Sequence, residues 1–202
     1  MPPIAAFSTD VDRTHRQHSI SSDLRAVLRA ATADSHIRLD RLLTSCELTR
    51  LEGYRRFLSI NAAALIPTEA ALRNSGAAEL VPDWVARTRS SALINDLDLL
   101  EAIPVPLPAP RTRLTYFEIL GALYVLEGSR LGAQYLWQTV KTSSDPRILN
   151  ATAFLRHGSG QRLWQSFLHL LQNQEPSPQD QADAVSAARA TFSRYLLAAD
   201  LA

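Results

Sequence analysis

One histidine and one aspartate lie a single helical turn apart in a segment with helical periodicity. His36 shares one side of the predicted helix with three leucines, Leu28, Leu39 and Leu43, and Asp40 follows it. Neutral imidazole is the commonest metal-binding side chain, and a carboxylate at its other ring nitrogen would orient it. Two interpretations therefore stay open: a core histidine hydrogen-bonded to a carbonyl or carboxylate, or a ligand of an iron atom.

A second feature is a line of glycines in a strongly helical stretch, residues 115–136. The chain has seven glycines, and three of them, Gly121, Gly128 and Gly132, fall here. Each costs a helix about 1 kcal/mol relative to alanine, and their spacing places them on one stripe. A stripe without side chains allows either a neighbouring helix or a flat ligand to approach the backbone closely. The spacing alone does not choose between these two.

Helical periodicity extends over most of the chain and predicts an all-α fold of about seven or eight helices. The main predicted helices span about residues 21–43, 51–74, 82–103, 115–142, 145–156, 161–174 and 178–199. Ser21 or Ser22 is the expected cap of the first helix. Thr115 and Glu118 form a capping box, and Pro67 is expected to kink or split the second helix.

The remaining segments predict one helical domain with a polar extension. Four prolines alternate over residues 104–110, which predicts an extended strap between two helices. Residues 1–20 are expected to be a flexible arm, and residues 21–202 the folded domain. The net charge of +1 argues against nucleic-acid binding, and no apolar run is long enough to span a membrane. The single cysteine allows no internal disulfide, and we expect a soluble, cytoplasmic protein.

The segments that carry the histidine and the glycines resemble one known family. Leu28-Arg-Ala-Ala-Thr-Ala-Asp-Ser-His36 and Leu123-Tyr-Val-Leu-Glu-Gly-Ser-Arg-Leu-Gly-Ala133 are similar to bacterial haem oxygenases, above all to members that accompany bacteriophytochromes. The resemblance extends from about Leu24 to Leu197 in the order and spacing of helices. It implies a haem-oxygenase-like bundle.

The resemblance also implies an activity. Such an enzyme cleaves haem, which is both substrate and cofactor, to biliverdin, carbon monoxide and iron. It uses O2 and electrons from a separate reductase or ferredoxin-type donor. A bacteriophytochrome is an implied partner, whose chromophore the enzyme would supply.

Site residues follow by matching positions. The resemblance implies that His36 is the proximal ligand of the haem iron and that Asp40 hydrogen-bonds its imidazole. Arg29 matches a basic residue that contacts a haem propionate. His169 falls near a second propionate contact, in a looser match.

On the opposite side of the haem, Gly128, Ser129 and Gly132 match the distal helix and are the implied catalytic set. Ser129 stands where many members have an aspartate that organises a water, and Ala133 stands where glycine is frequent. Both departures favour an alternative, a non-catalytic haem-binding carrier or sensor on the same fold. A helical interaction module without haem also stays open, as does a thiamin-type or quinone-type reaction on the same scaffold.

Overall fold

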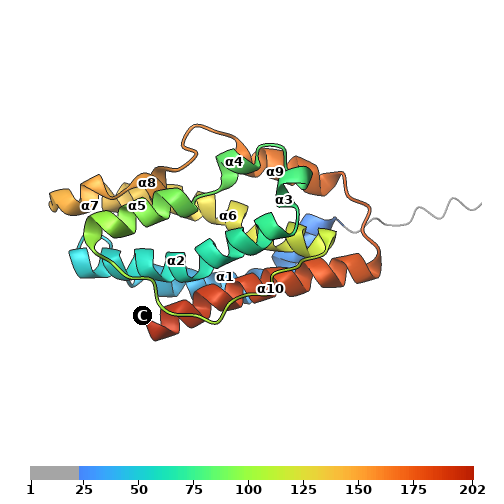
Figure 1. The fold of residues 1–202 in the computed structure, drawn as a ribbon, viewed down its shortest axis with the longest axis horizontal. Coiled ribbons are helices and arrows are strands. Elements are labelled where there is room, and N and C mark those ends of the chain that lie inside the picture. Colours follow the sequence, from blue (N-terminus) through green and yellow to red (C-terminus); the bar gives the residue numbers. More distant parts are fainter. Residues whose placement is uncertain (1–22) are drawn as a thin grey trace, which may run out of the picture.

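The described residues form helices joined by short loops and one long extended connector (Figure 1). The structure is a computed structural model that describes residues 23–202, and this part of the chain contains no strand. The all-α prediction is therefore confirmed. The arm predicted over residues 1–20 lies outside the described residues.

Ten helices occur between residues 23 and 202, and six of them have ten residues or more. They are α1 (Leu24–Thr44), α2 (Leu51–Asn74), α3 (Ala77–Leu80), α4 (Trp84–Arg87), α5 (Ser90–Leu100), α6 (Tyr116–Val140), α7 (Pro146–Asn150), α8 (Ala153–Arg156), α9 (Leu163–Gln172) and α10 (Pro178–Leu201). The number exceeds the predicted seven or eight because the structure includes four very short helices, α3, α4, α7 and α8. None of these helices is long and apolar enough to cross a membrane.

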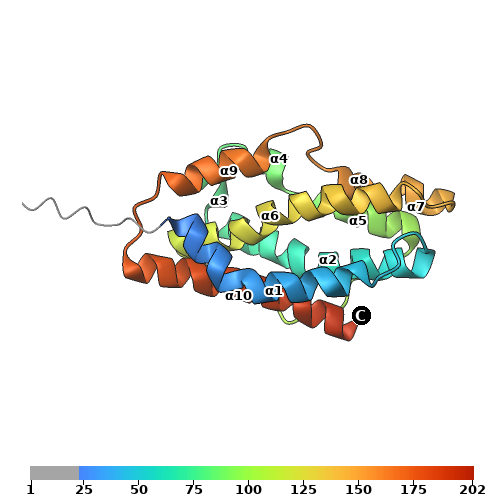
Figure 2. The ribbon, with the colours of Figure 1, turned by 180° about the vertical axis from the view of Figure 1, so that it is seen from behind.

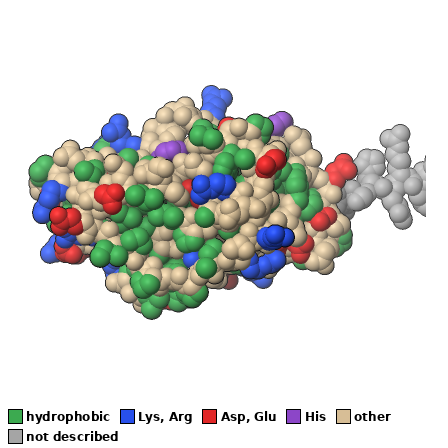
Figure 3. Space-filling model, viewed as in Figure 1, with side chains coloured by type: hydrophobic (Ala, Val, Ile, Leu, Met, Phe, Trp, Pro, Cys, Tyr) green, Lys and Arg blue, Asp and Glu red, His purple; other side chains and the backbone are tan. Residues whose placement is uncertain are grey.

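The long helices form the body of the fold. Helix α10 packs against α6, α1 and α2, and α1 lies beside it when the molecule is seen from behind (Figure 2). Helix α5 packs against α2, α7 and α8, and α8 and α9 pack against α6, in the upper part of the view in Figure 1. On the face shown in Figure 3, positive and negative side chains are scattered among hydrophobic ones. That face therefore presents no continuous basic surface.

Two helix starts follow directly from local sequence. Thr115 and Ser177 both form complete capping boxes, with Glu118 and Asp180 three residues later. The predicted cap of α1 is wrong, because Asp23 fills that position and accepts a hydrogen bond from the backbone N–H of Arg25 at 3.0 Å. An aspartate is as good a cap as a serine, so the preference alone could not select between them.

The helix predicted over residues 82–103 is divided into α4 and α5. Glu69 of α2 stabilises the break, because its buried carboxylate accepts from the backbone N–H groups of Arg89 at 2.8 Å and Ser90 at 3.0 Å. These N–H groups lie at the start of α5, where a helix has no partners of its own for them. A side chain from another helix thus caps α5.

The helix predicted over residues 145–156 is divided in the same way, into α7 and α8. Asp96 of α5 is fully buried and accepts from the backbone N–H groups of Ala153 at 3.0 Å and Phe154 at 2.8 Å. Burial raises the pKa of Asp96, although these two hydrogen bonds lower it. The distant cap positions Phe154, which contributes to the site described below.

Pro67 does not split α2, which is continuous from Leu51 to Asn74. Proline has no N–H, so the carbonyl of Ala63 lacks its usual helical donor. Arg194 of α10 supplies one, at 3.3 Å, and its other terminal nitrogen donates to the carbonyl of Pro108 at 2.8 Å. The same side chain therefore holds the extended strap between α5 and α6, which is non-helical as predicted.

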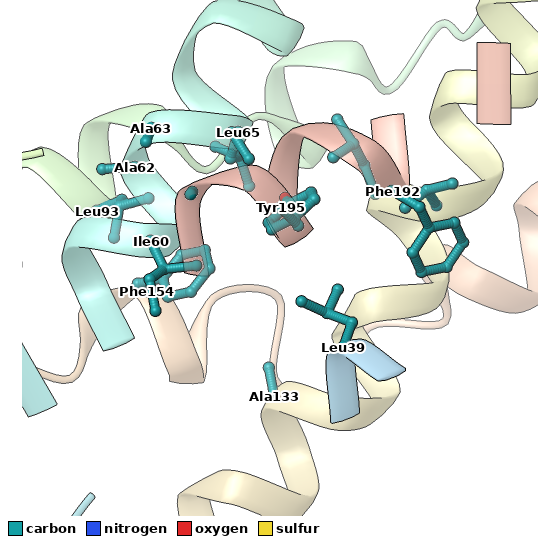
Figure 4. Packing of buried hydrophobic residues seen from close by; sticks show 14 of the residues in the cluster. Leu39, Ile60, Ala62, Ala63, Leu65, Leu93, Ala133, Phe154, Phe192 and Tyr195 are labelled. Atoms are coloured by element: carbon teal, nitrogen blue, oxygen red, sulfur yellow. The ribbon is translucent and has the colours of Figure 1, made fainter. Parts of the chain in front are cut away.

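Buried side chains fill most of the space between the helices (Figure 4). Ile60 and Leu65 of α2 and Leu93 of α5 are all fully buried, and Ile60 lies near Leu93 in this view. Leu39 and Phe192, which also appear in Figure 4, belong to this cluster and also line a cavity. The packed core therefore forms part of the wall of the cavity that is described below.

Candidate functional site

A cavity of about 520 Å³ lies between α1, α6 and α10, within the usual size range of ligand pockets. Most of its lining is apolar, and α6 supplies the largest share. The residues from α1 are His36, Leu39, Asp40, Leu43 and Thr44, and those from α6 are Tyr124, Val125, Gly128, Ser129, Leu131, Gly132, Ala133, Tyr135 and Leu136. Other helices and loops add Phe57, Asn61, Arg89, Phe154, Trp164, Phe192 and Tyr195.

His36 lies in the wall that α1 contributes. Its Nδ1 is 2.9 Å from Oδ2 of Asp40, and its side chain is 62% exposed. The ring also contacts that of Phe192 edge to face, with centroids 6.1 Å apart. The core interpretation of His36 is therefore wrong. Because Asp40 occupies Nδ1, Nε2 is the nitrogen that can bind a metal atom in the cavity.

The three glycines of α6 have different surroundings. A Cβ atom on Gly121 would overlap the carbonyl of Ala184, so this glycine allows α6 and α10 to cross closely. A Cβ on Gly128 would lie 3.8 Å from the ring of Trp164, and a Cβ on Gly132 would have no neighbour within 4 Å. The helix-crossing explanation thus holds for Gly121. Gly128 and Gly132 instead present bare backbone to the cavity.

Ser129 also lines the cavity, but its proton is already engaged. The hydroxyl donates to the carbonyl of Leu126 at 2.8 Å and accepts from Nη2 of Arg89 at 2.9 Å. The same Nη2 donates to the carbonyl of Leu126 at 2.8 Å. Ser129 can therefore accept a further hydrogen bond through its remaining lone pair, with a positive charge beside it.

The sequence did not reveal several polar residues of the cavity, and the two most deeply buried of them are Arg89 and Tyr195. Arg89 stands at a helix break that the periodicity did not show. Tyr195 lies on the apolar side of α10, where its hydroxyl gives no signal that distinguishes it from a core aromatic. Both side chains are almost completely buried.

Arg29 and His169, the two predicted propionate contacts, do not line the cavity. Arg29 is exposed and lines a shallow hollow with Arg25, but its charge reaches the cavity residue Tyr124. Burial raises the pKa of Tyr124, and the two arginines oppose that rise. His169 is exposed on α9, with Nε2 3.4 Å from Nδ2 of Asn173.

A buried cluster of charges supports the outer side of α6. Glu127 binds Nη1 of Arg87 at 2.7 Å and Nε of Arg130 at 3.0 Å, and all three side chains are buried. Arg87 also binds Asp83, and it donates to the carbonyl of Leu163 at 3.0 Å. Removing one member would leave an uncompensated buried charge, which is strongly unfavourable. The cluster therefore holds α4, α6 and α9 together beside the cavity.

His157 lies at the edge of this cluster, with Nδ1 3.3 Å from Nη1 of Arg130. Burial lowers its pKa, the positive charges of Arg130 and Arg89 lower it further, and Glu127 opposes them. The neutral ring is therefore the form that the folded protein favours.

This environment predicts a specific loss of stability in acid. The unfolded chain protonates His157 at its ordinary pKa of about 6.5, before the folded protein does. Stability from this residue is thus present above that pH and is lost as the pH falls through it. We expect thermal denaturation temperatures to fall by a few degrees between pH 7 and pH 5.5, and less in His157→Gln. An identical acid response in both proteins would contradict this assignment.

The fold and the site define an all-helical protein in which a carboxylate-paired histidine and a glycine ridge line one apolar cavity. A family model described as Heme oxygenase matches residues 111–198. A curated relative, Heme oxygenase PigA of Pseudomonas aeruginosa, is 28% identical over 172 residues, which cover 83% of this chain and 87% of the relative.

A solved structure shares the fold. The NO- and CO-bound haem oxygenase of Neisseria meningitidis superposes with a TM-score of 0.74 at 22% sequence identity, over 88% of this chain and 90% of the other. The chain is therefore similar in sequence to haem oxygenases over most of its length, and it shares the fold of one of them.

Proposed function

We propose that this protein is a haem oxygenase, which cleaves haem with O2 and external electrons to biliverdin, carbon monoxide and iron. The similarity to haem oxygenases in sequence and fold supports this activity. The observation that carries it to this chain is the cavity itself. His36 and the bare backbone of Gly128 and Gly132 line the same space of about 520 Å³.

The residues of the cavity fit a haem. Nε2 of His36 would bind the iron, and Asp40 would hold the imidazole through Nδ1. A Cβ atom would protrude into open space at Gly132, so its absence leaves room for a flat ring against α6. Arg29, whose charge reaches Tyr124, would pair with a propionate at the rim of the cavity. His169 stays a weaker candidate for the same task.

Haem, when bound, supplies the iron that activates O2 and the porphyrin carbon that is oxidised. The chain would position the haem, exclude water from it and provide polar groups beside it. Gly128 and Gly132 would bring the α6 backbone close to the ring, and Trp164 and Phe192 would exclude bulk water. Ser129 would accept a hydrogen bond on the α6 side, because its own proton is donated to Leu126.

The electrons must come from outside the chain, so we propose a reductase or a ferredoxin-type protein as the redox partner. A bacteriophytochrome that takes up the product is the further partner implied by the sequence resemblance. Both proposals can be tested by measuring turnover with and without the added protein.

A direct assay tests the proposed function. The purified protein is loaded with haemin and given ascorbate or a ferredoxin–reductase pair in air. We expect the Soret absorbance to disappear, a bilin absorbance to replace it, and carbon monoxide to be captured by added myoglobin. Haem that stays bound and unbleached through the same treatment would contradict the oxygenase.

The assay also decides the alternative, a haem-binding carrier or sensor. Two features of Ser129 favour this alternative. Its proton is donated to the carbonyl of Leu126, and its side chain is not a carboxylate that could organise a water. A carrier would release intact haem to an acceptor such as apomyoglobin. Formation of bilin without an acceptor would exclude it.

A further inference from the structure

Two buried polar atoms that belong to lining residues of the cavity lack a hydrogen-bond partner among the described residues. They are Nε of Arg89 and the hydroxyl of Tyr195, and both residues line the cavity. Arg89 is 2% exposed and Tyr195 is also 2% exposed. Buried polar groups in folded proteins nearly always have a partner, because an unpaired one keeps its full desolvation cost. Each of these two atoms can therefore still donate one hydrogen bond.

The positive charge of Arg89 is also weakly compensated. Its Nη2 donates only to uncharged oxygens, the carbonyl of Leu126 and the hydroxyl of Ser129. No carboxylate lies within ion-pair distance of it among residues 23–202. Glu69 and Glu127 act on it from further away, and Arg130 repels it.

The surroundings of Arg89 strengthen its field in the cavity. The guanidinium lies over the ring of Phe154, 5.3 Å from the centroid, and is shielded from bulk water. Electrostatic attraction is stronger in such a place than in water. A small anion that reaches it would gain a charge-assisted hydrogen bond and would neutralise a buried charge.

Tyr195 faces the same part of the cavity from α10. Its hydroxyl is close enough to Arg89 and Glu69 for their charges to act on its pKa, which burial raises far above the ordinary value. The phenol therefore keeps its proton and acts as a neutral donor. Asn61, which also lines the cavity, has its Nδ2 engaged, because it donates to the carbonyl of Phe57 at 2.8 Å.

We propose that Arg89 and Tyr195 form an anion-binding subsite on the Ser129 side of the cavity, which holds a small inorganic anion next to the haem. The subsite rests on the proposed function, because haem must be present to bring the anion there. It selects anions over neutral ligands of similar size. Arg89 contributes charge, and Tyr195 contributes one uncharged hydrogen bond.

Azide binding to the ferric haem complex tests the subsite. Affinity is measured by absorption titration for the natural protein, Arg89→Met, Tyr195→Phe and the control Arg156→Met. Arg156 is exposed on α8, stacks on Trp137 and does not line the cavity. We expect azide affinity to fall about 10- to 100-fold in Arg89→Met and about 2- to 10-fold in Tyr195→Phe. The control is expected to match the natural protein.

Two further readouts separate this role from a structural one. Carbon monoxide, a neutral ligand of ferrous haem, is expected to bind Tyr195→Phe and the natural protein within about twofold. The haem-free Tyr195→Phe protein is expected to melt at the same temperature or higher, because the lost hydroxyl has no protein partner. If Arg89→Met does not fold, the azide affinity of Tyr195→Phe still tests the proposed subsite.

Unchanged azide affinity in Tyr195→Phe would overturn the subsite and leave the oxygenase proposal intact. An equal loss of azide and carbon monoxide affinity would also overturn it, because charge and hydrogen bonding would not be the cause. Failure of the natural protein to bind haemin would overturn the proposed function, and the subsite with it.

Discussion

His36→Ala is expected to remove the axial imidazole signature from the absorption spectrum of the haem complex and to abolish bilin formation. Loss of a residue that only supports a metal ligand commonly costs 10- to 100-fold in affinity or activity. Loss of the ligand itself is therefore expected to lower turnover by at least about 100-fold. Absorption titration with haemin and the bilin assay measure the two effects.

The exposure of His36 offers a rescue experiment. Its side chain is 62% exposed at the cavity wall, so added imidazole can reach the space that the alanine leaves. We expect imidazole to restore the ligand spectrum in part. His157→Gln is the matched control, because this histidine lies outside the cavity and contacts Arg130. A haem spectrum that His36→Ala leaves unchanged would exclude His36 as the iron ligand.

Alanine at Gly132 and alanine at Gly121 are expected to act in opposite ways on the free protein. At Gly132 the added methyl meets no atom within 4 Å, so the usual gain in helix propensity should raise the free energy of unfolding by about 0.5–1 kcal/mol. At Gly121 the methyl overlaps the backbone of Ala184, and the crossing of α6 and α10 must open. This overlap is expected to cost about 3 kcal/mol or more.

The two substitutions are expected to affect haemin affinity in the opposite way: Gly132→Ala should lower it, and Gly121→Ala should not. The methyl group at Gly132 occupies space that the haem ring needs, so we expect haemin affinity to fall roughly tenfold. Gly121 does not line the cavity, and whatever Gly121→Ala protein stays folded should bind haemin normally. Thermal denaturation and haemin titration measure both effects. Natural haemin affinity in Gly132→Ala would show that the bare backbone at this position is not needed.

The helical nature of the chain and several helix ends were predictable because their causes are local. The capping boxes at Thr115 and Ser177 each use two residues three positions apart, which the sequence shows directly. The extended strap follows from prolines that cannot join a helix. His36 and Asp40 are one helical turn apart, so their pairing at 2.9 Å also follows from spacing.

The two breaks that the sequence analysis missed have distant causes. Glu69 caps the start of α5 from 20 residues away, and Asp96 caps α8 from 57 residues away. A periodic pattern cannot show such a contact, because the carboxylate and the amide meet only when the helices pack. These contacts place Arg89 and Phe154 beside the cavity.

The sequence by itself determined the long helices, the histidine with its aspartate, and a helix that carries glycines on one stripe. Only the tertiary structure decided that Gly121 serves a helix crossing while Gly132 faces open space. It also decided that Arg89 and Tyr195 are buried polar groups of the cavity. The physical reason is that propensity and capping act within a few residues, whereas burial depends on which distant segments pack together.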